Sequence, residues 1–156
     1  MAVEIEKKFL LNYLPQALLG KPESICQGYI VNRKEIIVRI RLSGDKAFIT
    51  IKGPTINNSR NEYEYPLPIE DAKQMLTLFC QKNQVEKKRY KIDYKGFVWE
   101  IDQFTGKNQG LIIAEIELES VDQKFEKPDW IGKEVSQDAR YYNSNLIEHP
   151  YSTWNS

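Results

Sequence analysis

The chain has 156 residues, a size typical of one domain, with 22 basic and 22 acidic residues and no net charge. Zero net charge argues against a general nucleic-acid binder, which normally carries a basic excess. No apolar run approaches the ~20 residues needed to cross a bilayer, and the acidic N-terminus is unlike a signal peptide. We therefore expect a single cytoplasmic domain over residues 1–156, without nucleic-acid or membrane partners, as a monomer or a homodimer.

Several common catalytic centres are excluded by residues that the sequence lacks. The single histidine, His149, has nothing near it that would complete a serine or cysteine triad. Cys26 and Cys80 match no metal or redox spacing, which predicts free thiols. The sequence contains no P-loop and no G-x-G-x-x-G turn, so a phosphate site here cannot depend on a glycine-rich cradle.

The first half of the chain is dominated by strands in which charged and apolar residues alternate. Side chains alternate across a strand, so residues two apart share a face. Residues 3–8 have this pattern, residues 38–42 and 47–52 form an expected hairpin around the turn 43–46, and residues 60–65 follow. The charged faces of these strands carry Glu4, Glu6, Lys8, Arg39, Arg41, Lys52, Arg60, Glu62 and Glu64.

Helical spacing of apolar residues is clear over residues 69–80. Pro66 and Pro68 precede this stretch, and two acidic residues suit the positive end of its dipole. Its apolar stripe predicts a packing surface, made of Ala72, Met75, Leu76 and Phe79. Shorter helical stretches are expected at 14–19 and 138–147.

The second half returns to alternating strands, at residues 86–94, 99–102 and 114–119. Lys91, Asp93 and Glu119 lie near strand ends, where an ordinary solvated position is equally expected. The charged faces of these strands carry Lys87, Arg89, Lys91, Asp93, Glu100, Asp102, Glu115, Glu117 and Glu119.

The charged faces segregate by sign. Two are mainly basic, at 39–41 and 87–89, and two are acidic, at 100–102 and 115–119. The charged face of any single strand could simply be the solvent-exposed face of a half-exposed antiparallel sheet. Like charges two apart repel, however, and a closed sheet with its charged faces inward would bring acidic and basic strands together. The pattern therefore predicts an α+β fold, an antiparallel β-barrel with a charged lumen and helices packed outside. Three large aromatic residues are expected to pack outside the barrel, namely Trp130, Tyr142 and Trp154.

Such a lumen suits a metal-bound polyphosphate. Carboxylates bind hard cations, and arginine and lysine bind phosphate oxygens. Phosphoryl transfer depends mainly on positioning and electrostatics, so it needs no nucleophilic serine, cysteine or histidine. The alternative is a structural ion-pair network, which would be costly because so many charges would be desolvated without a ligand.

The stretch Glu4-Ile5-Glu6-Lys7-Lys8 resembles the Glu-x-Glu-x-Lys signature of the CYTH superfamily, the triphosphate tunnel metalloenzymes. The remaining landmarks follow in the family's order over residues 4–146, essentially the whole domain. They are Gln27-Gly28-Tyr29, Arg39-x-Arg41, Ile51-Lys52-Gly53, Arg60-x-Glu62-x-Glu64, Lys87-x-Arg89-Tyr90, Glu100-x-Asp102, Glu115-x-Glu117-x-Glu119 and Arg140-Tyr141.

The resemblance implies an eight-stranded antiparallel barrel that binds a triphosphate and divalent Mg²⁺ or Mn²⁺. In the family's scheme, Tyr29 and Lys87 are candidates to orient or deprotonate the attacking water. The phosphate-binding residues would be Lys8, Arg39, Arg41, Lys52, Arg60, Lys87 and Arg89. The metal region would be formed by Glu4, Glu6, Glu62, Glu64, Asp102, Glu115 and Glu117.

Among the triphosphates used by this family, we favour inorganic tripolyphosphate. The connections are short and leave little room for a lobe that recognises a base, and the chain lacks a basic tail for RNA. Hydrolysis of nucleoside or thiamine triphosphate, or adenylate cyclase activity of the class IV type, is the alternative on the same scaffold. A polyphosphate or nucleotide sensor without catalysis is the alternative from another class, although it would not need the full set of carboxylates.

Overall fold

The structure is a computed structural model that describes residues 3–154. Its strands form one antiparallel sheet whose order is β5-β4-β3-β2-β6-β7-β8-β1-β9, with an additional pairing between β5 and β1. The bounds are β1 (Val3–Leu11), β2 (Glu23–Asn32), β3 (Ile37–Ser43), β4 (Lys46–Lys52), β5 (Ser59–Pro66), β6 (Gln84–Tyr94), β7 (Phe97–Phe104), β8 (Ile112–Glu117) and β9 (Ile131–Glu134).

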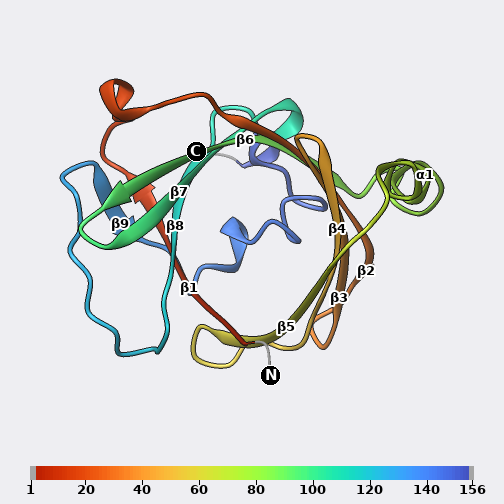
Figure 1. The fold of residues 1–156 in the computed structure, drawn as a ribbon, viewed down its shortest axis with the longest axis horizontal. Helices are drawn as coiled ribbons and strands as arrows, with labels where there is room; N and C mark the ends of the chain where they lie inside the picture. The colour runs from red at the N-terminus through yellow and green to blue at the C-terminus, as the bar shows by residue number, and fades with distance from the viewer. Residues whose placement is uncertain (1–2, 155–156) are drawn as a thin grey trace.

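The pairing of β1 with β5 closes the first eight strands into a barrel, which Figure 1 shows from one end. Glu4 lies opposite Arg60 at this closure. The ninth strand, β9, lies outside the ring and pairs with the other end of β1, where Leu11 is opposite Ile131. The predicted eight-stranded antiparallel barrel is therefore confirmed, with one short strand added to it.

One side of the barrel's outer surface is covered by helix α1 (Ile69–Phe79), as predicted. Ala72 and Leu76 of the helix are buried against Ile40 and Ala47 of the sheet. The contact is close at Gly28 of β2, since a Cβ atom there would lie 2.6 Å from the Cβ of Cys80. A side chain at position 28 would therefore push the helix away from the barrel.

The opposite side is covered without an α-helix, which corrects the expectation of several outer helices. Trp99 of β7 is fully buried, with its ring edge-to-face against Phe9, Phe125 and Trp130. Phe125 and Trp130 belong to the irregular segment between β8 and β9. Aromatic packing in this segment thus replaces the second helical layer. The helix expected at 14–19 is a single 3-10 turn, Gln16–Leu18.

The C-terminal segment (residues 135–147) differs most from expectation. A helix was predicted at 138–147, but only a 3-10 turn forms, Ala139–Tyr141, followed by further turns. Asp138 caps the start of this turn by accepting from the backbone N–H of Arg140, whereas the Asn145 amide donates to the carbonyl of Ala139, an acceptor that a longer helix would use. Figure 1 shows this segment crossing the middle of the barrel.

One end of the barrel interior, which we call the inner end, is filled by apolar side chains and not by charged ones. Tyr141 and Leu146 of the C-terminal segment are buried in a cluster with Val85, Phe104 and Ile113 of the barrel wall. The lumen is therefore charged over only part of its length. Cys26 and Cys80 are free thiols, as predicted. Within residues 3–154, no helix is long and apolar enough to cross a bilayer.

Candidate active site in the barrel lumen

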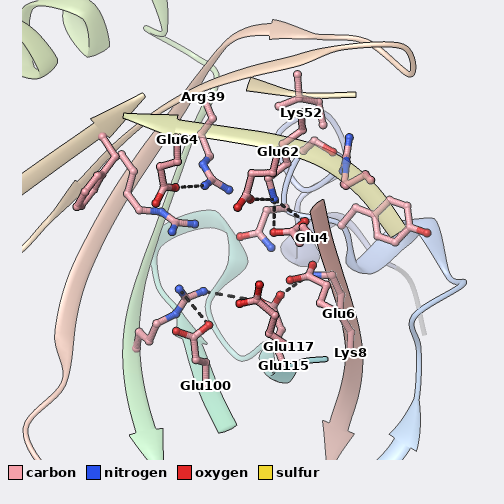
Figure 2. A pocket seen from close by; sticks show the side chains of 18 of the residues that line it. Glu4, Glu6, Lys8, Arg39, Lys52, Glu62, Glu64, Glu100, Glu115 and Glu117 are labelled. Atoms are coloured by element: carbon pink, nitrogen blue, oxygen red, sulfur yellow. Dashed lines mark hydrogen bonds and ion pairs between the residues drawn. The ribbon is translucent and has the colours of Figure 1, made fainter. Parts of the chain in front are cut away.

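A cavity of about 440 Å³ occupies the charged part of the lumen. Figure 2 shows acidic and basic side chains from opposite strands pointing toward one another in it. The strand pattern explains this, because each charged residue alternates with an apolar residue that faces outward. Of the residues predicted for the site, those that line the cavity are Glu4, Glu6, Lys8, Tyr29, Arg39, Arg41, Lys52, Arg60, Glu62, Glu64, Lys87, Arg89, Glu115 and Glu117.

Three carboxylates of β1 and β8, which we call the acidic wall, are Glu4, Glu6 and Glu117. Glu6 lies directly opposite Glu117 in the strand pairing. Burial raises the pKa of Glu6 to about 7, and repulsion from Glu115 adds to this effect. Burial also raises the pKa of Glu4 and of Glu117, which lies close to both other carboxylates. Glu6 shares Lys8 with Glu115, and Glu4 shares Lys52 with Glu62, so this side of the cavity has fewer lysines than carboxylates.

Two cations on the other side, which we call the basic wall, are Arg41 of β3 and Lys87 of β6. Burial lowers the pKa of Lys87 to about 7, and the nearby guanidinium groups of Arg89 and Arg41 contribute. Burial lowers the pKa of Arg41 to about 10, with repulsion from Arg39 and Arg89. Lys87 shares the carboxylate of Asp102 with Arg89, and Arg41 forms no ion pair among the described residues, so this side has fewer counter-ions than cations.

Two close ion pairs join neighbouring strands beside the walls, one between β1 and β8 and one between β6 and β7. The Nζ of Lys8 lies 3.0 Å from an oxygen of Glu115. Burial opposes both charges, but their attraction raises the pKa of Lys8 and lowers that of Glu115 well below its usual range. Arg89 donates from Nε and Nη2 to the two oxygens of Asp102, at 2.7 and 2.8 Å. This fork raises the pKa of Arg89 despite its burial.

Asp102 departs from the predicted metal region. It is fully buried and does not line the cavity. Besides the fork from Arg89, one of its oxygens lies 2.7 Å from the Nζ of Lys87. Burial opposes its charge, yet Lys87 and Arg89 hold the pKa of Asp102 below its usual range. The structure thus places this carboxylate behind the two cations, where it orients them.

The strands β3, β4 and β5 contribute a second group of paired charges. Lys52 donates to both oxygens of Glu4 at 2.9 Å and lies 3.3 Å from Glu62. Arg39 donates to Thr50 at 3.1 Å and lies 3.6 Å from Glu64. The Nε atom of Arg39 is buried without a hydrogen-bond partner among the described residues.

Arg60, the remaining predicted cation, is tied to the backbone at the edge of the cavity. Its Nε and Nη2 atoms donate to the carbonyl oxygen of Gly53, at 3.0 and 2.6 Å. It still lines the cavity, opposite Glu4 in the strand pairing.

A CYTH domain profile matches residues 2–151. The chain is 47% identical over 154 residues to an inorganic triphosphatase of Acetivibrio thermocellus, covering 99% of both proteins. It is 35% identical over 147 residues to an inorganic triphosphatase of Nitrosomonas europaea, covering 92% of this chain and 95% of that protein. The chain belongs to the CYTH family. The crystal structure of an inorganic triphosphatase, 34% identical, matches with a TM-score of 0.67 over 94% of this chain and 95% of that one.

CYTH triphosphatases depend on a metal, and the donors of the acidic wall fit a hard divalent cation. They supply carboxylate oxygens alone, and their mutual repulsion would be relieved by added positive charge. Within residues 3–154, no three ligand side chains already converge at metal-binding spacing. The lysines explain this, because Lys52 holds both oxygens of Glu4 and Lys8 lies 3.5 Å from Glu6.

Sequence reasoning missed the contribution of the C-terminal segment to this CYTH site. Ser136, Tyr142, Asn143 and Ser144 line the cavity, although Tyr142 was expected to pack outside the barrel. Alternation gives no signal for them, because they lie on an irregular segment whose position depends on the apolar inner end. Lys91 and Glu100 also line the cavity, and both belong to charged faces that the sequence had identified.

Proposed function

We propose that this CYTH protein hydrolyses inorganic tripolyphosphate to pyrophosphate and phosphate with Mg²⁺ or Mn²⁺ bound at the acidic wall. The observation that carries the proposal is the pair of oppositely charged walls across one cavity, each with counter-ions that are shared between two groups. A metal ion supplies the charge that the acidic wall lacks, and phosphates supply the charge that the basic wall lacks. Relatives named inorganic triphosphatases at 47% and 35% identity support the choice of substrate.

In this proposal Glu4, Glu6 and Glu117 hold the metal, with Glu62, Glu64 and Glu115 lining the same region. The bound metal would neutralise phosphate oxygens and so make the terminal phosphorus easier to attack. Lys8 and Lys52, which now pair with carboxylates, would then be freed to turn toward phosphate oxygens.

The phosphates would lie between the metal and the basic wall. Arg41 and Arg89 stabilise the negative charge that develops as the terminal phosphoryl group leaves, with Arg39 and Arg60 holding the rest of the chain.

Lys87 is the candidate base. Its pKa of about 7 leaves a substantial neutral fraction at neutral pH, so its Nζ can accept a proton from the attacking water. The water oxygen then bonds to the terminal phosphorus as the bond to the bridging oxygen of pyrophosphate breaks. The Tyr29 hydroxyl, which accepts a hydrogen bond from Gln27 at 3.1 Å, would orient this water.

The test is phosphate release by the purified protein from tripolyphosphate, ATP and thiamine triphosphate in parallel, each with Mg²⁺, Mn²⁺ or EDTA. We expect metal-dependent release that strongly favours tripolyphosphate. Preferred release from ATP or thiamine triphosphate would contradict the substrate. No release from any of them, with tripolyphosphate still raising the melting temperature, would indicate a sensor or a cyclase.

A further inference from the structure

A pair of amide side chains sits at the inner end of the cavity and has no role in the reaction proposed above. Asn143 comes from the C-terminal segment, and Gln27 comes from β2 and is fully buried. The Oδ1 atom of Asn143 accepts two hydrogen bonds, from Lys87 Nζ at 2.8 Å and from Gln27 Nε2 at 3.2 Å. One oxygen of the C-terminal segment thus receives donors from two barrel strands.

Gln27 extends this network along the basic wall to the neighbouring strand β3. Its Oε1 atom accepts from Arg41 Nε at 3.0 Å, and its Nε2 atom donates to the Tyr29 hydroxyl at 3.1 Å. The contact with Arg41 fixes the oxygen end of Gln27, because arginine can only donate, and the Nε2 group of Gln27 then donates to the oxygen of Asn143. A single network therefore joins Arg41, Tyr29 and Lys87 through two neutral amides.

A lysine ammonium on a flexible four-carbon stem needs more than one partner to hold a fixed position. Asp102 holds the Nζ of Lys87 from within the wall at 2.7 Å, and Asn143 holds it from the cavity side. An amide oxygen does this without adding negative charge where phosphates would bind. A carboxylate at position 143 would repel them.

We infer that Asn143 is a positioning residue for Lys87, oriented by Gln27, so that the C-terminal segment completes the reactive end of the cavity. This inference rests on the proposed hydrolysis, in which Lys87 accepts the proton of the attacking water. Asn143 itself need not touch the reacting atoms.

The chain offers a matched control for the substitution of Asn143. Asn145 lies two residues further on, does not line the cavity, and donates to the carbonyl of Ala139 within the same segment at 2.7 Å. Asn145→Ala removes an amide of the same size that supports the segment's own turns. It leaves the contact between Lys87 and Asn143 in place. Its kcat therefore shows the effect of destabilising the segment without removing that contact.

The experiment compares steady-state hydrolysis of tripolyphosphate by the wild type, Asn143→Ala and Asn145→Ala at saturating Mn²⁺. For Asn143→Ala we expect kcat to fall about tenfold to a hundredfold, the factor that corresponds to one lost hydrogen bond to a charged group. We expect its KM to change by less than about threefold, because binding by the other cations is retained. Asn145→Ala should keep wild-type kcat, and an equal loss in both variants would overturn the inference.

A double-mutant cycle tests whether Asn143 acts through Lys87. In a Lys87→Met background, adding Asn143→Ala should lower the residual kcat by less than about twofold, because the partner is already gone. A further loss as large as in the wild-type background would overturn the positioning role.

Failure of the inference and failure of the proposed function give different results. Wild-type hydrolysis together with an unimpaired Asn143→Ala variant would overturn the inference alone. If the wild type does not hydrolyse tripolyphosphate, the proposed function fails, and the readout becomes the rise in melting temperature caused by tripolyphosphate in EDTA. Positioning of Lys87 then predicts a smaller rise for Asn143→Ala than for Asn145→Ala, and equal rises would overturn it.

Discussion

The acidic wall and the basic wall are built by the same alternating pattern, yet their charges respond to burial in opposite ways. The pKa of Glu6 is raised to about 7, toward the neutral acid, and the pKa of Lys87 is lowered to about 7, toward the neutral amine. Each wall has too few counter-ions, because Glu6 shares Lys8 with Glu115 and Lys87 shares Asp102 with Arg89. The two closest pairs, Lys8 with Glu115 and Arg89 with Asp102, show the opposite shifts.

The difference separates groups that already have a counter-ion in the ligand-free protein from groups that share one. Groups that share a counter-ion mark where a ligand of opposite charge would bind first. A metal-bound triphosphate meets both requirements at once, because its cation faces one wall and its phosphates face the other.

The largest expected effect is on the acidic wall. Glu4→Gln removes one metal-ligand charge, and we expect kcat to fall by about a thousandfold, because charge stabilisation by the metal is worth several kcal/mol. Tripolyphosphate should still bind in EDTA, as judged by melting temperature. Glu119→Gln is the matched control, since Glu119 is exposed beyond β8 and does not line the cavity. Undiminished turnover in Glu4→Gln would contradict the metal-site assignment.

The next largest effect concerns Asp102, a paired charge, and we expect it to lower the free energy of unfolding. Asp102→Asn leaves Lys87 and Arg89 without their buried counter-ion, which should lower the free energy of unfolding by about 3–5 kcal/mol. Urea unfolding of this variant and of Asp93→Asn, an exposed aspartate of β6, measures the difference. Wild-type stability combined with weaker Mn²⁺ binding would return Asp102 to the metal region that the sequence predicted.

On the basic wall we expect a pH effect on kcat/KM. Lys87 accepts a proton only when it is neutral, so kcat/KM should rise about tenfold per pH unit below its pKa of about 7 and level off above it. The profile should be measured at saturating Mn²⁺, so that titration of the acidic wall does not contribute. Lys87→Met should abolish the rise, and an unchanged profile in that variant would assign the base to another group.

The smallest expected effect is the pH dependence that Glu6 gives to the stability of the metal-free protein. Because the pKa of Glu6 is raised from its usual 4.5 to about 7, the folded protein binds an extra proton between these values. In EDTA, the wild type should therefore lose stability relative to Glu6→Gln as pH rises from 5 to about 7, with no further loss above that. Melting curves of both proteins measure it, and added Mg²⁺ should reverse the loss. A difference that is independent of pH would contradict the raised pKa of Glu6.

Alternation predicted which side chains face the lumen because it depends only on strand geometry. It placed Glu6, Arg41 and Lys87 correctly in one cavity. It could not distinguish Asp102 from the residues that line the cavity. Asp102 lies on the same face as Arg89 but is buried behind it. That distinction depends on how far along the barrel each residue lies and on what fills the inner end.

The C-terminal segment shows the other limit of the sequence pattern. A helix was expected at 138–147, yet the segment continues in turns after Tyr141, where the Asn145 amide takes the carbonyl of Ala139. Its place in the lumen depends on Tyr141 and Leu146, which pack against inward-facing apolar residues from distant strands. Local periodicity contains no information about such a contact, so the role of Asn143 emerged only from the fold. The cytoplasmic location and the choice between monomer and homodimer stay predictions.

The most direct test of the two-wall account is a crystal structure with Mn²⁺ and an imido analogue of tripolyphosphate that resists hydrolysis. Anomalous scattering would locate the metal independently of the phosphates. The account predicts Mn²⁺ bound by Glu4, Glu6 and Glu117, with phosphate oxygens on Arg41 and Arg89. Mn²⁺ bound away from these three carboxylates, or phosphates outside the lumen, would contradict it.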